Sequence, residues 1–268
     1  MAEWKNAKLG PDAFDLAGKH ALVVGAAAPA GRAIALALAE AGADVTVAAA
    51  SASDGDEMFA VKKVAKEIEA MGRRAAAVAA DVSLGTGAQV MVRQVAKEAG
   101  RIDTLVNAQD LFFARPADRT TDAEWAKTLA MNLSSFFFTA RAAGKEMLRL
   151  GSGGRIINVT SVLGERAIAN VAAYAAAHGG VHNLTRALAQ EWGPHGITVN
   201  CIARGWMADH PALVEGDPEA GKTIRFVPLK RPGLPEELAP LAVYLASDVS
   251  GYISGQVLFV DGGLTTHL

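Results

Sequence analysis

Cysteine is almost absent from this chain of 268 residues, in which Cys201 is the single example. One thiol can build neither an internal disulfide framework nor a cysteine-based metal site, so a reducing compartment is the natural expectation. No charge-free run of about 18 apolar residues occurs, which excludes an ordinary transmembrane helix. The first residues, MAEWKNAKLGPDAF, lack the apolar core of a signal peptide. We therefore expect a soluble, cytoplasmic protein with no membrane partner.

The chain also has little excess charge of either sign. It contains 26 Lys and Arg residues against 28 Asp and Glu residues, with the two signs interspersed. Such a balance gives no basic surface for nucleic acid or for an anionic membrane. Small molecules and other proteins remain as partners. Cys201 lies in the apolar run GITVNCIA and is expected to be a buried strand residue.

Short apolar runs alternate with alanine-rich helical patterns along the whole chain. Strands are expected at 20–25, 43–50, 74–81, 102–108, 155–160, 196–203 and 256–260. Helices are expected after the first strand up to Gly42 and at 57–71, 87–99, 122–150, 171–192 and 235–247. Strands that are separated by helices pair in parallel, and both faces of such a sheet are covered. The pattern predicts one α/β domain over 1–268, with a doubly wound, Rossmann-type parallel sheet of seven strands and helices on both faces.

Two segments lie outside this alternation. Residues 1–18 are expected to form an N-terminal arm. Residues 204–234 are rich in Gly and Pro and follow the sixth strand. A segment of this kind over the carboxyl ends of the strands is a usual place for a substrate lid.

The residues with the most chemistry lie between Gly154 and Glu191. Ser161 ends a buried strand, and Tyr174 follows thirteen residues later on a long helix. A strand-loop-helix unit can direct two such hydroxyls at one carbonyl, although both can also form only local hydrogen bonds. His178 lies one turn beyond the tyrosine. An imidazole ordinarily titrates near pH 6.5, so it is a poor substitute for the fixed cation that makes a phenol acidic.

These elements, in this order, resemble the short-chain dehydrogenase/reductase family from Lys19 to Gly263. The features that carry the resemblance are Gly25, Gly31, Asp81, Val82, Asn107, Asn132, Ser161, Tyr174, the Asn200-Cys201 strand and the closing segment 260–263. The resemblance implies a general acid/base role for Tyr174, a substrate-oxygen contact for Ser161 and a proton-relay water on Asn132. It also places His178 where the family has a lysine that lowers the tyrosine pKa and holds the nicotinamide ribose.

The family pattern fails around the dinucleotide. Pro29 stands where the middle glycine of the first turn belongs, and proline has a ring and no N–H to offer a pyrophosphate. Proline is also a good first residue of a helix. At the end of the second strand, 48–51 reads Ala-Ala-Ala-Ser, without the carboxylate or arginine that a ribose or its phosphate would need. Asp54 and Asp56 fit a solvated loop better than a ribose site.

Further departures follow the fourth and sixth strands. The family turn Asn-Asn-Ala-Gly is Asn107-Ala108-Gln109-Asp110 in this chain, and a Pro-Gly pair has become Arg204-Gly205. A buried, unpaired Asp110 would be costly, so it is either paired or open to water.

The helix histidines allow several interpretations. We expect His178 to pack in the place of the lysine, and a substitute base is the alternative. His178 and His182 share a helix face at metal-ligand spacing, but no third ligand lies near them, and no metal site is expected.

We therefore predict a family member that has lost tight NAD or NADP binding and acts as a non-catalytic subunit. The residues implied for catalysis (Asn132, Ser161, Tyr174, His178) would then be vestigial or altered, as would those implied for the cofactor (Gly25, Gly31, Asp81, Val82, Asn107). The family includes heteromeric enzymes with one degenerate subunit, such as the 2-[hydroxy(phenyl)methyl]succinyl-CoA dehydrogenase of anaerobic toluene degradation. By this resemblance the partner is an active paralogue, for example a hydroxyacyl-CoA dehydrogenase. In the family the long helices, here 122–150 and 171–192, form the oligomer interface, and a homo-oligomer is otherwise expected.

Two alternatives remain open. The first is an active NAD(P)-dependent alcohol or ketone oxidoreductase that uses Tyr174, Ser161 and Asn132. The second is a non-redox enzyme similar to the halohydrin dehalogenases, which carry arginine four residues after the tyrosine and an aromatic residue in the first turn. This chain has His178 and Pro29 at those two places.

Overall fold

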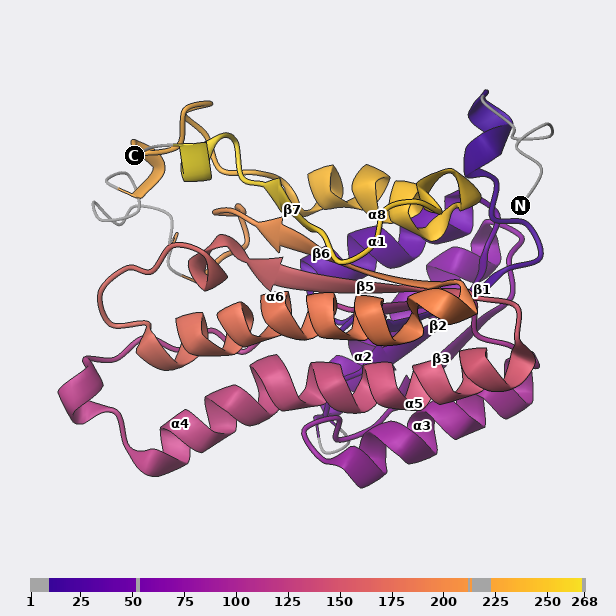
Figure 1. Cartoon of the computed structure of the whole chain (residues 1–268), viewed down its shortest axis with the longest axis horizontal. Helices are drawn as coiled ribbons and strands as arrows, with labels where there is room; N and C mark the ends of the chain where they lie inside the picture. The colour runs from indigo at the N-terminus through magenta and orange to yellow at the C-terminus, as the bar shows by residue number, and fades with distance from the viewer. Residues whose placement is uncertain (1–9, 52–53, 212, 214–222, 267–268) are drawn as a thin grey trace.

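The computed structural model describes residues 10–51, 54–211, 213 and 223–266. Seven parallel strands form one sheet in the order β3-β2-β1-β4-β5-β6-β7 (Figure 1). The strands are β1 (His20–Val24), β2 (Asp44–Ala49), β3 (Ala75–Ala79), β4 (Thr104–Asn107), β5 (Gly154–Ser161), β6 (Ile197–Arg204) and β7 (Val257–Val260). The predicted doubly wound sheet of seven strands is confirmed.

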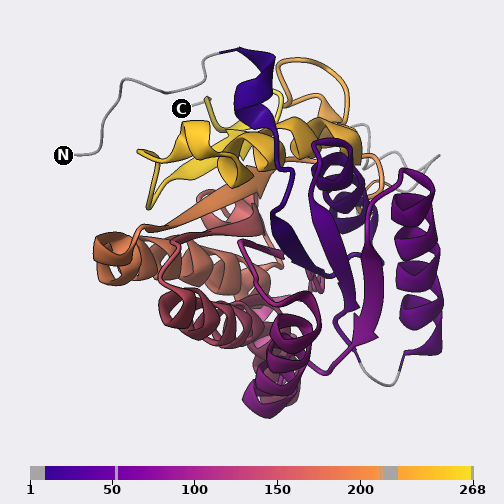
Figure 2. The same cartoon turned by 90° about the vertical axis from the view of Figure 1, so that its right-hand side faces the viewer.

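Helices cover both faces of the sheet (Figure 2). The helices are α1 (Pro29–Glu40), α2 (Gly55–Ala70), α3 (Gly85–Ala99), α4 (Asp122–Leu129), α5 (Ser135–Leu150), α6 (Ala172–Trp192) and α8 (Ala239–Ala246). The apolar core on one face is built with α1, α2 and α8, and the core on the other face with α3, α5 and α6. Because both faces are covered, the central strands are buried along their whole length, which explains their unbroken apolar runs.

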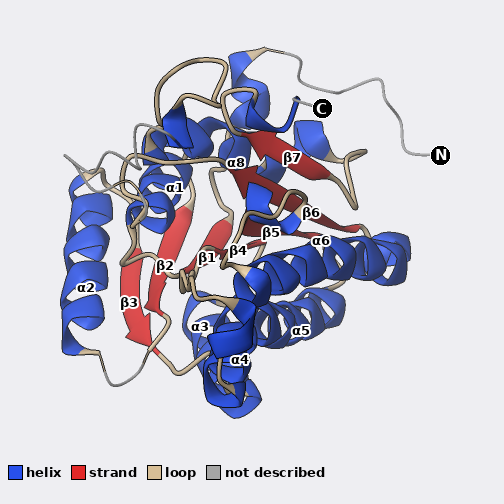
Figure 3. Ribbon diagram, turned by 90° about the vertical axis from the view of Figure 1, so that its left-hand side faces the viewer, coloured by secondary structure: helices blue, strands red, loops and turns tan. Residues whose placement is uncertain are grey.

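The sheet order reverses between β1 and β4. Their neighbours lie on opposite sides, so a crevice forms at the carboxyl ends of these two strands. Figure 3 views the molecule from this edge, where the loops after the strands gather. The position of the candidate site therefore follows from the topology.

The helix predicted over 122–150 is interrupted. α4 and α5 are separated by a turn of π-helix, Ala130–Ser134. Within it, the Asn132 side chain binds both backbone groups of Leu111, accepting from its N–H (2.8 Å) and donating to its carbonyl (2.9 Å). This contact with the loop after β4 holds Asn132 at the wide turn, and π-turns are frequent at functional sites.

The start of α2 also differs from the prediction. The Asp54 side chain accepts from the N–H groups of Asp56 and Glu57 (both 3.0 Å), so it caps a helix that begins at Gly55. Asp54 is exposed and lies just outside the helix, whereas Asp56 lies in its first turn, so the expected solvated loop is wrong for Asp56. Glu57 reaches back to the end of β2.

The two segments outside the alternation are described in part. Residues 1–9 of the arm and 212 and 214–222 of the lid segment lie outside the described residues. The rest of the arm contains a 3-10 helix, Pro11–Phe14, and Leu16 donates to the Ala41 carbonyl (2.7 Å). The helix expected over 235–247 consists of a 3-10 turn, Pro235–Leu238, followed by α8. None of the helices in the described residues has the length and apolar character needed to cross a membrane.

Candidate functional site

Four side chains meet at the carboxyl edge of the sheet. Asp110 follows β4, Arg204 is the last residue of β6, and Tyr174 and His178 lie one turn apart on α6. The carboxyl ends of parallel strands share one edge of the sheet, and this brings Asp110 and Arg204 together across 94 positions of sequence. We call these four residues the Asp110 cluster.

Asp110 is the centre of the cluster. Its Oδ1 accepts from the Tyr174 hydroxyl at 2.8 Å and lies 3.2 Å from His178 Nε2. Its Oδ2 accepts from Arg204 Nη2 at 2.5 Å. The Asp110 side chain is only 16% exposed and that of Arg204 11%. The sequence left open whether Asp110 is paired or open to water, and the structure shows it paired.

The charges of the cluster fix its protonation. Burial works against ionisation of Asp110, but Arg204 and the hydrogen bonds from His178 and Tyr174 outweigh it and hold the pKa of this carboxyl below its usual range. Burial would lower the pKa of Arg204, but Asp110 outweighs it and raises that pKa. The cluster therefore contains a carboxylate and a guanidinium.

The tyrosine of this cluster is not acidic. Burial and then the Asp110 charge raise the pKa of Tyr174 well above that of a free phenol, while Arg204 opposes this only in part. The carboxylate accepts the hydrogen bond that the phenol donates, which favours the protonated form. A general base must be able to lose its proton near the working pH, so Tyr174 in this arrangement is a hydrogen-bond donor and not a base.

The other residues implied for catalysis are placed apart from these bonds. Ser161 Oγ accepts from the N–H of Leu163 at 3.1 Å and caps the short helix after β5. Asn132 binds Leu111, the residue after Asp110, with both ends of its amide. Within the described residues, no hydrogen bond joins either side chain to Tyr174. Asn132 instead positions the loop that carries Asp110.

The two helix histidines have different partners. His178 is buried, packs edge-on against Tyr174 with ring centroids 4.3 Å apart, and faces Asp110 through Nε2. At the position where the family resemblance implies a lysine, this chain therefore has an imidazole that is the partner of a carboxylate. His182 Nε2 lies 3.1 Å from Thr160 Oγ1, and burial lowers the pKa of His182 to about 4. Among the described residues, no three His, Cys, Asp or Glu side chains come together as a metal site would require.

Aromatic side chains of Phe112 and of residues in segment 204–234 pack around the cluster. Phe112 packs edge-on against Tyr174, with centroids 5.3 Å apart, and against His210 at 4.6 Å. Trp206 packs against His210 at 4.8 Å. Burial, and next the charge of Arg204, lower the pKa of His210 to about 4, so this imidazole is neutral at pH 7.

The glycines implied for the dinucleotide are needed by the turn itself. A Cβ on Gly25 would lie 2.4 Å from the backbone nitrogen of Gln109, and one on Gly31 would lie 2.4 Å from the carbonyl oxygen of Gly25. Gly25 also has a positive φ of 80°. Both positions therefore require glycine whether or not a ligand is present. The N-terminus of α1 has no side-chain cap, but Pro29 removes one of its donors, so a pyrophosphate fits there only in part.

The remaining implied cofactor residues have structural partners. Asn107 donates to Asn158 (3.0 Å) and accepts from Thr139 (2.7 Å) in the core. Asp81 accepts from the N–H and hydroxyl of Ser83, and Val82 is buried. None of these bonds requires a nucleotide.

The end of β2 is closed by a residue that the sequence did not single out. The Glu57 carboxylate accepts from the N–H groups of Ala50 (3.0 Å) and Ser51 (3.2 Å). It supplies a negative charge where the strand itself has none. An acidic residue in the first turn after an Asp cap was the available signal.

A nicotinamide fits the reacting end poorly. In the chemistry that the family resemblance implies, the tyrosine hydroxyl binds the reacting oxygen, with a cation four residues later. In this chain the hydroxyl of Tyr174 is bonded to Asp110, and His178 is bonded to the same carboxylate. Arg204 brings a cation to this place, but Asp110 neutralises it. The sequence indicated each change separately and missed that they form one cluster.

Comparison with known proteins gives the family. A family model described as enoyl-(acyl carrier protein) reductase matches residues 25–265. The chain is 34% identical over 252 residues to 2-dehydro-3-deoxy-D-gluconate 5-dehydrogenase of Dickeya dadantii, which covers 93% of this chain and 96% of that protein. It is 33% identical over 260 residues to gluconate 5-dehydrogenase of Gluconobacter oxydans, covering 96% and 99%.

A solved structure agrees with this assignment. The gluconate 5-dehydrogenase of Burkholderia cenocepacia in complex with NADP and tartrate superposes with a TM-score of 0.88 at 32% identity, covering 96% of this chain and 99% of that one. The order of the strands matches the fold that the sequence resemblance implied. The chain belongs to the short-chain dehydrogenase/reductase family.

Proposed function

We propose that this chain does not transfer hydride by itself and serves as the non-catalytic subunit of an assembly with an active member of the family. The observation that carries the proposal is the 2.8 Å hydrogen bond from the Tyr174 hydroxyl to Asp110. Through this bond the tyrosine that the family resemblance implies as the acid/base donates its hydrogen bond to the Asp110 carboxylate and not to a substrate oxygen.

The energetic argument concerns the phenolate. To act as a base, Tyr174 would have to carry a negative charge beside the Asp110 carboxylate in a buried site. Each pKa unit above the ordinary value of about 10 adds roughly 1.4 kcal/mol to the free energy of making the phenolate. A lysine four residues later would offset this, but His178 stands there and shares the carboxylate. Proton transfer through Tyr174 is therefore disfavoured at neutral pH.

Weak cofactor binding is supported at both ends of the nucleotide site. Pro29 removes a donor from the start of α1, and Asp110 holds the hydroxyl that would face the reacting centre. Glu57 places a negative charge at the end of β2, which disfavours a 2′-phosphate there. Pro29 and Asp110 oppose tight binding of NAD and NADP alike, and Glu57 adds a further penalty for NADP, which alone carries the 2′-phosphate.

The subunit part of the proposal is supported by the intact scaffold. The helices that form the interface in the family are present, and Trp125 on α4 and Leu148 and Leu150 on α5 keep 37–42% of their surface exposed. Exposed apolar side chains on interface helices are suited to contact with another chain. An active paralogue is the partner that the family resemblance indicates.

The second candidate is an active NAD(P)-dependent oxidoreductase, and the comparisons favour it over the first. Relatives that match 93% and 96% of the chain are named as dehydrogenases, and one similar structure holds NADP. For this chain to act in the same way, Asp110 would have to leave the Tyr174 hydroxyl, after which Ser161 and Asn132 would complete the site. Overall identity to these relatives does not by itself fix the chemistry, which depends on the residues of the Asp110 cluster.

Nucleotide binding separates the two candidates. The full chain is titrated with NADH and NADPH and followed by thermal unfolding, since a ligand at 100 times its dissociation constant stabilises by about 2.7 kcal/mol. We expect no shift at millimolar nucleotide for the wild type. The matched variant Asp110→Gly, Arg204→Gln, His178→Lys removes the carboxylate together with its guanidinium partner and restores the cation four residues after Tyr174, and it should bind NADH more tightly than the wild type does.

The opposite result would support the second candidate. Binding of either nucleotide by the wild type in the micromolar range, with turnover of an alcohol that disappears in Tyr174→Phe, would exclude a non-catalytic role. Purification from the native source tests the partner separately. Recovery of a homo-oligomer alone, without a second dehydrogenase-like chain, would contradict the subunit proposal.

A further inference from the structure

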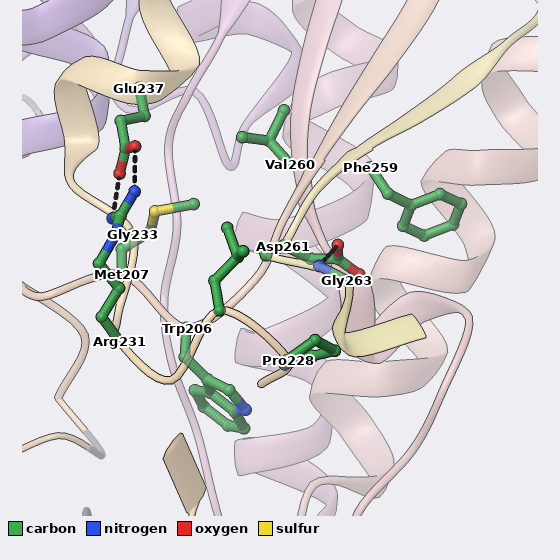
Figure 4. A pocket seen from close by; sticks show the side chains of 12 residues that line it. Trp206, Met207, Pro228, Arg231, Gly233, Glu237, Phe259, Val260, Asp261 and Gly263 are labelled. Carbon is green, nitrogen blue, oxygen red and sulfur yellow. Dashed lines mark hydrogen bonds and ion pairs between the residues drawn. The ribbon is translucent and has the colours of Figure 1, made fainter. Parts of the chain in front are cut away.

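Trp206 lines two neighbouring pockets beside the Asp110 cluster. The first, shown in Figure 4, has a volume of about 480 Å³. Its arginine is already ion-paired, because Arg231 makes two 2.7 Å bonds to Glu237. The Asp261 carboxylate accepts from the N–H of Gly263 at 2.9 Å. Among the described residues that line it, this pocket therefore offers an apolar wall and no unpaired cation.

The second pocket differs in its charge. It has a volume of about 450 Å³ and is lined by Val162, Leu163, Arg166, Ala167, Ile168, Trp206, Thr223, Arg225, Phe226, Leu264 and Thr265. These lining residues include two arginines and no carboxylate. The volume is in the range of small-molecule sites. We call it the Arg166/Arg225 pocket.

The two guanidinium groups keep donors available. Arg166 Nη2 donates to the Thr265 carbonyl at 3.1 Å, and the Arg225 guanidinium lies over the Phe226 ring at 4.7 Å from its centroid. Among the residues that the structure describes, neither arginine forms an ion pair with a carboxylate. A guanidinium has five donors in a planar fork that matches a carboxylate or phosphate. Two guanidinium groups at one pocket, with no carboxylate among its described lining residues, favour an anion.

The rest of the lining favours an apolar body. Leu163 and Trp206 are buried, while Ile168 and Phe226 remain 50% and 55% exposed at the pocket. A sugar acid has hydroxyl groups along its whole length and would leave these side chains without matching contacts. An aryl or aliphatic chain would remove their apolar surface from water.

We propose that the Arg166/Arg225 pocket binds a small organic anion with an apolar body, such as an aryl or medium-chain carboxylate. The carboxylate lies between the two arginines, and the apolar part packs on Trp206, Ile168 and Phe226. Leu163 and Trp206 belong to the same apolar cluster as Tyr174, so a ligand in this pocket lies next to the Asp110 cluster. Binding of this kind needs neither a nucleotide nor a reactive tyrosine, and it goes beyond the proposed function.

The test is a binding measurement by isothermal titration calorimetry on the full chain without nucleotide. The probes are 4-phenylbutyrate, its neutral analogue 4-phenylbutanamide, and gluconate. We expect 4-phenylbutyrate to bind at least roughly tenfold more tightly than the amide, because its carboxylate can form charge-assisted hydrogen bonds with the two arginines and the neutral amide cannot. It should also bind more tightly than gluconate, which has the charge but not the apolar body.

Two double variants locate the site. Arg166→Gln, Arg225→Gln should remove the preference for the acid over the amide. Arg93→Gln, Arg119→Gln removes two exposed arginines elsewhere and should leave the preference unchanged. Equal binding of acid and amide, equal binding of gluconate, or an unchanged preference in the pocket variant would each overturn the proposal. Nucleotide binding by the wild type would contradict the proposed function and leave this test unaffected.

Discussion

Replacing Asp110 by asparagine should destabilise the protein strongly, because it leaves Arg204 as a buried charge without a partner. The two side chains are 16% and 11% exposed and are joined at 2.5 Å. Breaking a buried ion pair by removing one partner typically costs 3–5 kcal/mol. An asparagine oxygen can still accept from Tyr174, so we expect about 3 kcal/mol for Asp110→Asn.

A double-mutant cycle isolates the ion pair. Arg204→Gln alone should also be costly, since it leaves the Asp110 carboxylate buried. Asp110→Asn, Arg204→Gln leaves no buried charge, so the two losses should be non-additive by about 2 kcal/mol or more. The measurement is urea unfolding at pH 7 followed by far-UV circular dichroism. Glu146→Gln is the control, because its partner Arg149 is 61% exposed and such pairs contribute about 0–1 kcal/mol.

The pH dependence gives a second readout of the same pair. The folded-state pKa of Asp110 is below that of a free carboxyl, so its contribution to stability is present above about pH 4 and is lost as the pH falls through the folded-state pKa. The unfolding free energy of Asp110→Asn should therefore fall less between about pH 4 and lower pH than that of the wild type. A cost under about 1 kcal/mol for Asp110→Asn, or strictly additive losses in the cycle, would refute the view that a buried ion pair holds the site.

Three further outcomes are expected. The absorbance change at 295 nm between pH 7 and pH 11 should be the same for the wild type and Tyr174→Phe, because the raised pKa keeps Tyr174 protonated; a smaller change in the variant would contradict this. Cys201 should not react with Ellman's reagent at pH 8 until urea unfolds the chain, since burial raises its thiol pKa to about 11, and rapid native labelling would be the opposing result. Gly31→Ala should lower the unfolding free energy, measured by urea unfolding, by about 1–3 kcal/mol, because its Cβ would lie 2.4 Å from the Gly25 carbonyl oxygen. Gly55→Ala is the control: a Cβ there has no atom within 4 Å, so the variant should be as stable as the wild type or more so.

The fold could be predicted from the sequence because its signals are local and repeated. Each strand is a short apolar run between helical patterns. Because both faces of the sheet are buried, every position of a central strand is apolar, and the strand can be recognised without an alternating pattern. The boundaries that differ have particular causes. The break at Ala130–Ser134 involves residues that are all compatible with a helix, and it is associated with the contact between Asn132 and Leu111. A contact between distant segments leaves no periodic signal.

The candidate site could be predicted only in part. Comparison with the family pattern identified Tyr174 as a match and Asp110, His178 and Arg204 as departures, each considered separately. The cost of burying a carboxylate also indicated that a buried Asp110 needs a partner. It could not identify Arg204 as that partner, because this depends on the side-chain directions at the ends of β4 and β6. Because parallel strands end at one edge of the sheet, the sequence could limit the possible partners of Asp110 to residues at the ends of neighbouring strands. It could not select Arg204 among them.

The Asp110 cluster also limits which single substitutions could convert this site into one with the residues usual in the family. Asp110→Gly alone leaves the Arg204 guanidinium buried without its counter-charge. His178→Lys alone places a second cation against a carboxylate that already has one, and Arg204→Gln alone leaves the carboxylate with only His178 and Tyr174 as partners. Each single step passes through an unbalanced buried charge, which is among the costliest defects that a folded protein can carry. The cluster is therefore stable as a unit, and a change of chemistry at Tyr174 requires Asp110 and Arg204 to be altered together.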